Sequence, residues 1–175
     1  EPDKYPMAGQ TSHEVTVGVY DVAADKTLYL KAGDPKDRYF TNVAWSPDSK
    51  TIYIFELNRD QNDCRLVSYD ATTGERIAEL YRETDDKYVE PQHPIMFLPW
   101  DASKFVLQSQ KDGYNHLYLF DTKGNELKQL TPGSNSEVCR KYPGLYEVNK
   151  PNATSVYVEV EFHDVAAYAQ WIIEH

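Results

Sequence analysis

The sequence is poor in cysteine and in positive charge. Its two cysteines, Cys64 and Cys139, are too few to hold a fold together by disulfides. They could pair in an oxidising compartment, but Cys64 begins a predicted strand and Cys139 lies in an unrelated segment. We therefore expect two free, partly buried thiols. Lys and Arg total 18 against 28 Asp and Glu, a net charge of −10 that argues against nucleic acid and anionic membrane surfaces as partners.

Long apolar segments are absent as well. No run approaches the roughly 20 residues that a membrane-spanning helix needs, and no charged-then-apolar leader opens the chain. No membrane span is therefore predicted within these 175 residues. The 14 tyrosines, beside only two methionines, instead favour a β-rich protein.

What the chain does contain is a repeated pattern, in which an aromatic-Asp pair ends one strand and a turn leads to the next. The three copies are Tyr20-Asp21 with Leu28 and Leu30, Tyr69-Asp70 with Ile77 and Leu80, and Phe120-Asp121 with Leu127 and Leu130. Their aspartates lie 49 and 51 positions apart (70 − 21 and 121 − 70). Glycines at 74, 113 and 124 supply the positive φ that tight turns need.

A second pair of strands is predicted upstream of each later copy. Residues 42–50 lead into an alternating segment at 51–57, and residues 95–104 lead into another at 105–109. Four short strands in about fifty residues are typical of a β-propeller blade. The alternative is an ordinary meander with accidental similarity. We predict an all-β fold, a partial β-propeller of about two complete four-stranded blades plus half blades, with a short C-terminal helix.

The pattern divides the chain into two predicted parts. Residues 1–133 form a partial propeller domain, and residues 134–175 form an extra strand pair and the terminal helix, of uncertain affiliation. The segments of the first part are half a blade at 13–31, a polar loop at 32–41, a blade at 42–81, a charged connector at 82–90 and a blade at 92–131. In the second part, strands are expected at 145–148 and 156–162, and Asp164 caps the helix.

Five motifs in order carry a resemblance to a known family. They are Tyr5-Pro-Met-Ala-Gly9, the strand Val15-Thr-Val-Gly-Val-Tyr-Asp21, Ala44-Trp-Ser-Pro-Asp48, Gln110-Lys-Asp-Gly-Tyr-Asn-His-Leu-Tyr118 and Gln129-Leu-Thr-Pro-Gly133. Together they resemble the N-terminal β-propeller region of the dipeptidyl peptidase IV family, within the prolyl oligopeptidase-like serine peptidases. The resemblance covers residues 3–133, and residues 134–175 do not match the family's pattern.

The resemblance implies that catalysis belongs to a parent enzyme. In this family a C-terminal α/β-hydrolase domain carries a Ser-Asp-His triad, with the nucleophile on a Gly-x-Ser-x-Gly elbow. The sequence has no such elbow, and the family's paired glutamates for the peptide amino terminus would lie before Tyr5. No catalytic, cofactor-binding or metal-binding residue is therefore assigned, and no cofactor is expected. The resemblance also implies a periplasmic or secreted location, peptide substrates and a hydrolase domain in the parent.

Several polar segments suggest chemistry but favour a structural interpretation. Glu83, Asp85 and Asp86 suggest paired carboxylates, but their connector also contains basic residues, so a solvated loop is expected. The segment 60–63 has oxygen ligands at short spacing, without the Gly and distant Glu of a calcium loop, so a turn is expected. Asn152-Ala-Thr154 is a glycosylation sequon by pattern only.

A structural role is also expected for two histidines. His116, near Asp112, is expected to hydrogen bond within or between blades. His163-Asp164 lies between a strand and a helix, where a hydrolase would carry its triad histidine, but no nucleophile accompanies it and Asp164 has a capping role. The three tryptophans are expected to pack within the fold: Trp45, Trp100 and Trp171.

Two functional hypotheses follow. The favoured one is a non-catalytic propeller segment of a dipeptidyl peptidase IV-like serine peptidase, which limits the access of substrates from which N-terminal X-Pro dipeptides are removed. The alternative is a stand-alone, propeller-like scaffold that binds proteins in the periplasm. The chain begins in the middle of a repeat, which favours the first hypothesis, and its exposed sheet edges predict self-association.

Overall fold

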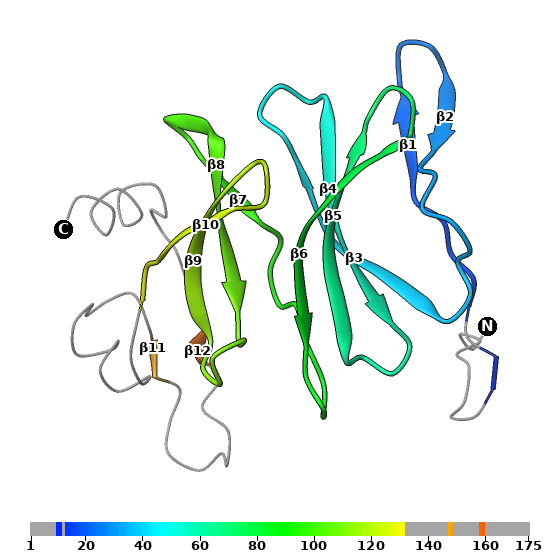
Figure 1. Cartoon of the computed structure of the whole chain (residues 1–175). Coiled ribbons are helices and arrows are strands. Elements are labelled where there is room, and N and C mark those ends of the chain that lie inside the picture. Colours follow the sequence, from blue (N-terminus) through cyan, green and yellow to red (C-terminus); the bar gives the residue numbers. More distant parts are fainter. Residues whose placement is uncertain (1–9, 12, 132–146, 149–157, 160–175) are drawn as a thin grey trace. The chain divides into compact units, whose positions relative to one another are not determined.

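The secondary structure is entirely β in the part of the chain that the structure describes (Figure 1). The computed structural model describes residues 10–11, 13–131, 147–148 and 158–159. The chain divides into two compact units, Glu1–Ile95 and Met96–His175, and each is described by itself. The all-β prediction is confirmed, while the predicted C-terminal helix lies outside the described residues.

The first unit contains a hairpin and a four-stranded antiparallel sheet. The hairpin pairs β1 (Gly18–Asp21) with β2 (Lys26–Tyr29). The strands of the sheet are β3 (Arg38–Trp45), β4 (Thr51–Asn58), β5 (Asp63–Asp70) and β6 (Arg76–Thr84). Each strand pairs with the next along the chain, which is the order expected of a propeller blade.

This blade begins at Arg38, so the prediction of a polar loop over the whole of 32–41 is wrong. Residues 38–41 pair with β4, from Arg38 opposite Asn58 to Thr41 opposite Phe55. The register then shifts, and Asn42 takes a positive φ of 53° at the shift. Such a bulge interrupts the alternation of a strand, so the sequence pattern does not reveal the strand's first half.

One buried cluster of the first unit lies on a single face of the sheet, which we call the core face and to which alternate residues of β4 and β5 point. Ile52 and Ile54 of β4 lie opposite Tyr69 and Val67 of β5, and Leu30 completes the buried cluster. Burying each such side chain stabilises the fold by about 1.5–3 kcal/mol. β4 and β5 are buried on both faces, as expected of the two central strands.

The hairpin is joined to the sheet at the turn between β5 and β6. The Lys31 amide donates to the Gly74 carbonyl at 2.8 Å, and the Lys31 ammonium pairs with Glu75. Gly74 has a φ of +72°, and a Cβ at this position would lie 2.6 Å from the carbonyl oxygen of Tyr29. Glycine is required here because both the backbone conformation and the close contact exclude a side chain.

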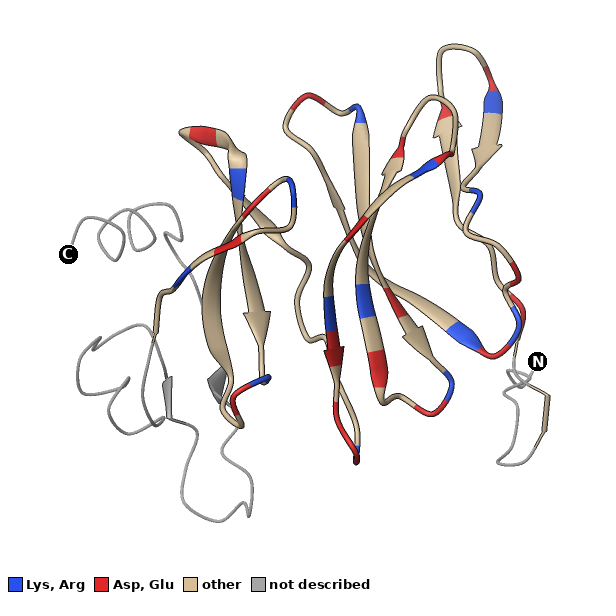
Figure 2. Ribbon diagram, in the orientation of Figure 1, with Lys and Arg blue, Asp and Glu red and all other residues tan. Residues whose placement is uncertain are grey.

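The outer strand β6 carries charged side chains along an exposed edge. Arg76, Glu79 and Arg82 are exposed, and Figure 2 shows acidic and basic residues close together along β5 and β6. Charged side chains on an edge strand oppose the addition of a strand from another chain.

The second unit contains a matching four-stranded sheet. Its strands are β7 (Met96–Leu98), β8 (Asp101–Ser109), β9 (His116–Asp121) and β10 (Glu126–Gln129), and each pairs with the next. The sequence predicts that this strand begins at residue 105, but β8 begins at Asp101. An aromatic row crosses three strands, because Phe105 lies opposite both Phe97 and Phe120, with ring centroids 5.9 and 5.8 Å apart.

The second unit also contains a short strand pair after the four-stranded sheet. β11 (Glu147–Val148) and β12 (Val158–Glu159) are antiparallel, and they fall within the strands predicted at 145–148 and 156–162.

The repeated aspartates each end a strand and cap the turn that follows. Asp70 Oδ1 accepts hydrogen bonds from the amides of Thr72 and Thr73, both at 2.8 Å. Asp21 and Asp121 accept equivalent bonds from amides two to four residues further on. The Thr72 hydroxyl and these amides lower the pKa of Asp70 to about 2. The repeat therefore specifies turns.

Candidate functional site

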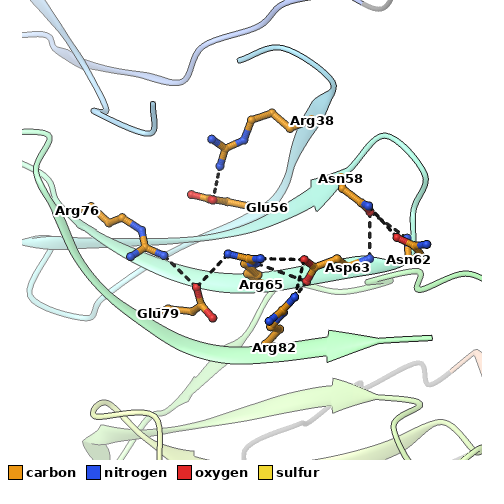
Figure 3. Close-up of polar contacts among 9 residues, drawn as sticks. All are labelled: Arg38, Glu56, Asn58, Asn62, Asp63, Arg65, Arg76, Glu79 and Arg82. Atoms are coloured by element: carbon orange, nitrogen blue, oxygen red, sulfur yellow. Dashed lines mark hydrogen bonds and ion pairs between the residues drawn. The ribbon is translucent and has the colours of Figure 1, made fainter. Parts of the chain in front are cut away.

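Polar side chains gather at one end of the core face in the first unit (Figure 3). Alternate residues of a strand share a face, so β4 continues from Ile54 to Glu56 and β5 continues from Val67 to Arg65. The flanking strands β3 and β6 add arginines. We call this group the arginine–carboxylate cluster, and its members are Arg38, Glu56, Asp63, Arg65, Arg76, Glu79 and Arg82.

Glu56 is the one buried carboxylate among the described residues, at 8% exposure. It accepts hydrogen bonds from the Tyr69 hydroxyl and from the Arg38 guanidinium. Arg38 also donates from Nη1 to the carbonyl oxygen of Ala32 at 2.7 Å. Burial, followed by the bond to Glu56, raises the pKa of Tyr69 above its usual range. This pairing is required, because a buried carboxylate without a partner would cost several kcal/mol.

Asp63 is shared between arginines of two neighbouring strands. Arg82 donates to its two oxygens from Nε at 2.8 Å and from Nη2 at 3.0 Å, and Arg65 donates from Nη2 at 2.8 Å. The bonds from Arg82 and then from Arg65 lower the pKa of Asp63 to about 2. Arg65 Nη1 also lies 3.6 Å from Glu79 Oε2, which extends the network across to β6.

Two cavities lie in this region. The smaller, of about 220 Å³, is lined by Arg38, Glu56, Leu57, Asn58, Asp63 and Arg65. The larger, of about 540 Å³, is lined by Gln10, Thr11, Lys36, Asp37, Asn58, Arg59 and Asp60. In the larger one, Arg59 pairs with Asp37 at 3.2 Å and donates to the Gln10 carbonyl at 2.7 Å. Two arginines and two carboxylates dominate the lining of the smaller cavity.

Sequence analysis did not identify this cluster. The available signal was Glu56, which stands at the third position of the alternation Ile52, Ile54, Glu56 and so puts a charge where a core residue is expected. A charge at a core position requires a partner, which directs attention to the arginines of the adjacent strands.

Most of the acidic residues singled out in the sequence lie in turns, but two lie in strands. Asp63 begins β5, and Glu83 lies in β6, which runs to Thr84, so the prediction of a connector over the whole of 82–90 is wrong for residues 82–84. Asp85 Oδ1 accepts hydrogen bonds from the amides of Lys87 at 2.7 Å and Tyr88 at 3.3 Å, and Asp86 is exposed beside it. Asp60 is also exposed, while the Asp63 carboxylate is occupied by its arginines. In the described parts of the chain, no three His, Cys, Asp or Glu side chains are placed to hold a metal ion.

His116 is buried in the second blade, at 1% exposure. Its Nδ1 lies 3.2 Å from Thr131 Oγ1, and this oxygen accepts the Leu117 amide at 2.9 Å. The Thr131 hydroxyl therefore links the imidazole to the backbone of β9. Asp112 Oδ2 lies 3.7 Å from Nε2, beyond hydrogen-bond length. The order Asp-His-hydroxyl resembles a catalytic triad, but Thr131 is 0% exposed and no substrate can reach it.

Cys64 and two tryptophans differ from their expected environments. Cys64 is a free thiol at 2% exposure, more deeply buried than predicted. Burial, with smaller effects of Glu83 and Asp63, raises its pKa to about 12. Trp45 and Trp100 are half exposed, at 46% and 45%, rather than packed within their own sheets.

The remaining predicted residues lie outside the described residues. They are Cys139, the sequon at 152–154, His163, Asp164 and Trp171. Among the described residues there is no helix long and apolar enough to cross a membrane.

Two four-stranded antiparallel sheets, formed from one strand pattern repeated about every fifty residues, define a protein of the β-propeller class. Comparison with known proteins specifies the family. The model of the N-terminal region of dipeptidyl peptidase IV matches residues 1–158, and the chain belongs to this family. The match extends beyond residue 133, where the resemblance noted in the sequence ends.

Solved structures of the family share this fold. A Bacteroides ovatus protein assigned as a dipeptidyl aminopeptidase IV is 53% identical, with a TM-score of 0.73. The match covers 75% of this chain and 21% of that protein. Porphyromonas gingivalis dipeptidyl peptidase 4 is 25% identical, with a TM-score of 0.65, and the match covers 84% of this chain and 19% of that one.

Curated relatives carry related names. A probable dipeptidyl-aminopeptidase B of Phaeosphaeria nodorum is 30% identical over 67% of this chain and 14% of the relative. A probable dipeptidyl peptidase 4 of Emericella nidulans is 26% identical over 74% of this chain and 18% of the relative. The chain therefore spans less than a fifth of the length of these relatives.

Proposed function

We propose that this chain is the non-catalytic propeller segment of a dipeptidyl peptidase IV-like serine peptidase. In this role it limits the access of peptides from which the parent removes N-terminal X-Pro dipeptides. The observation that carries the proposal is family membership over residues 1–158, together with two successive four-stranded blades. Relatives named as dipeptidyl peptidases are several times longer than this chain, so the hydrolase domain and its triad are assigned to the rest of the parent.

The chemistry of the described residues supports a non-catalytic role. The buried carboxylate Glu56 is held by Arg38 and Tyr69, and the buried histidine His116 is held by Thr131. These groups join neighbouring strands and turns, so they stabilise blades. A rigid blade is the property that a size-selective entrance requires, because a flexible one would admit larger substrates.

The first test is the mass of the native protein that contains this chain, captured with an antibody against it. We expect a species several times heavier than 20.2 kDa that hydrolyses chromogenic X-Pro substrates. A native species of 20.2 kDa without this activity would refute the proposal and favour the stand-alone scaffold.

A second test concerns access. With the captured parent, kcat/KM is measured for a series of peptides that share one X-Pro amino terminus and differ only in length, and for a folded protein with the same terminus. Size limitation predicts that kcat/KM falls steeply beyond a certain length and is lowest for the folded protein. Equal kcat/KM values across the series would contradict the access role without affecting the assignment to a peptidase.

Location and assembly form the last part of the proposal. We propose that the parent is periplasmic or secreted and that it self-associates. Fractionation with the same antibody tests location, and a parent found with cytosolic markers would contradict export. Light scattering over a range of concentrations tests assembly, and a constant monomer mass would contradict self-association.

A further inference from the structure

The 220 Å³ cavity in the arginine–carboxylate cluster has arginines on both sides of a carboxylate. β3, β4 and β5 are neighbours in that order, and Glu56 on β4 lies opposite Arg65 on β5. Arg38 on β3 reaches the same carboxylate from the other side (Figure 3). Both guanidinium groups therefore line one cavity from opposite strands.

Hydrogen-bond donors exceed acceptors in this cavity. Each guanidinium has five N–H groups. Arg38 uses Nη1 on backbone carbonyls and Nη2 on Glu56, and among the described residues its Nε has no acceptor. Arg65 uses Nε and Nη2 on Asp63, and its Nη1 lies 3.6 Å from Glu79, beyond hydrogen-bond length.

Each carboxylate oxygen of the cavity, in contrast, already accepts at least one hydrogen bond. Both oxygens of Glu56 accept hydrogen bonds, one from the Tyr69 hydroxyl and one from Arg38. The two oxygens of Asp63 accept bonds from Arg65 and Arg82. A ligand that enters the cavity would find free donors and occupied acceptors, which favours an anion over a cation.

Local charge does not oppose this ligand. The cavity lining holds two arginines and two carboxylates, a net charge of zero (2 − 2), although the whole chain carries −10. Charges beyond about 8–10 Å are largely screened at physiological salt, so the lining governs the binding of a small ion more than the whole chain does. The net negative charge disfavours a large polyanion.

The size of the cavity suits a small ligand. At about 30 Å³ for each water molecule, 220 Å³ holds about seven waters. A small oxyanion with a few waters fits this volume. Guanidinium groups bind the oxygens of carboxylates and phosphates with paired N–H donors, which matches the free donors of Arg38 and Arg65.

We propose that this cavity is a binding site for one small oxyanion, held by Arg38 and Arg65. Its chemistry is common to monocarboxylates and inorganic phosphate. The site belongs to a single blade, and the inference does not depend on the proposed peptidase function.

The test is calorimetric titration of the full chain with acetate or with inorganic phosphate, at constant ionic strength maintained with sodium chloride. We expect saturable 1:1 binding in the millimolar range. The probe that binds more tightly shows whether the site prefers a carboxylate or a phosphate. Arg65→Gln removes the free donor and should weaken binding about tenfold or more. Arg65→Lys keeps the positive charge but lacks the planar guanidinium with its paired N–H donors, and it should give a smaller but measurable loss of affinity.

The matched control is Arg76→Gln. Arg76 belongs to the cluster and pairs with Glu79 at 3.1 Å, but it does not line the cavity. Its loss should change the affinity by less than about twofold, because at constant ionic strength a distant charge contributes little. Absence of saturable binding with both anions would overturn the proposal. Equal weakening by Arg76→Gln and Arg65→Gln would also overturn it, because that result indicates general electrostatic attraction.

Discussion

The substitution Gly74→Ala adds one methyl group where the β1–β2 hairpin meets the sheet. Residue 74 has a φ of +72°, a conformation that costs a residue with a Cβ about 1–2 kcal/mol. The new Cβ would lie 2.6 Å from the Tyr29 carbonyl oxygen and 3.4 Å from Leu30 Cα, and backbone atoms cannot rotate away. Relief requires a shift of the hairpin, which weakens the Lys31–Gly74 backbone hydrogen bond by about 1 kcal/mol. The sum is a loss of about 2–3 kcal/mol.

The assay is urea unfolding of the full chain, with the free energy of unfolding obtained by linear extrapolation. The matched control is Gly33→Ala, also in the first unit, because Gly33 has a φ of +87° but a Cβ there would meet only Arg38 Nη1, at 3.8 Å. The control should lose about 1–2 kcal/mol, so the difference between the variants measures the close contact. Hydrogen exchange of residues 18–31 should accelerate in Gly74→Ala alone. If Gly74→Ala is no more destabilising than Gly33→Ala, the reasoning from the close contact is refuted.

Three further predictions concern the first unit. Glu56→Gln leaves the Arg38 guanidinium without its carboxylate and should lower the free energy of unfolding by about 2–4 kcal/mol. Tyr69→Phe removes only a hydroxyl and should lower the free energy of unfolding by about 1 kcal/mol. If urea unfolding gives equal losses for Glu56→Gln and Tyr69→Phe, the central role of Glu56 is contradicted. Because the folded-state pKa of Asp63 is lowered to about 2, its contribution is full above about pH 5 and disappears as the pH falls toward 2. Asp63→Asn should therefore lose about 2 kcal/mol at pH 7 and almost nothing near pH 2, and a pH-independent difference would contradict the ion pairs. Cys64, with a pKa of about 12, should resist iodoacetamide at pH 8 until urea unfolds the chain, and rapid native labelling in peptide mass spectra would contradict its burial.

The repeat could be predicted because the residues that mark it act locally. An aspartate that ends a strand caps its own turn, and a glycine or aspartate a few residues later takes a positive φ, as Asp70 and Gly74 show. These interactions depend on residues within about four positions, so they leave a periodic signal in the sequence. The starts of β3 and β8 could not be predicted, because they depend on pairing with a neighbouring strand.

The arginine–carboxylate cluster escaped prediction for the same reason. Arg38, Glu56 and Arg82 are far apart in the sequence, and only the register of four strands brings them together. The acidic residues that attract attention in the sequence, such as Asp85, are adjacent in the chain and form local turns. Proximity in the sequence therefore indicated turns, while the buried network depended on strand alignment.

Strand register shows that both blades place a polar pair at the same position. Counting back along β5 and β9 from the repeated aromatic-Asp pairs, His116 occupies the position of Arg65, and Ser109 opposite it occupies the position of Glu56. The two blades differ in the strand beside this pair. β3 extends past it and contributes Arg38, whereas β7 has only three residues and its described pairing with β8 ends at residue 106. A buried carboxylate requires a cationic partner from a neighbouring strand, and a serine at the same position does not. The length of the first strand thus explains why the first blade carries a buried carboxylate where the second carries a serine.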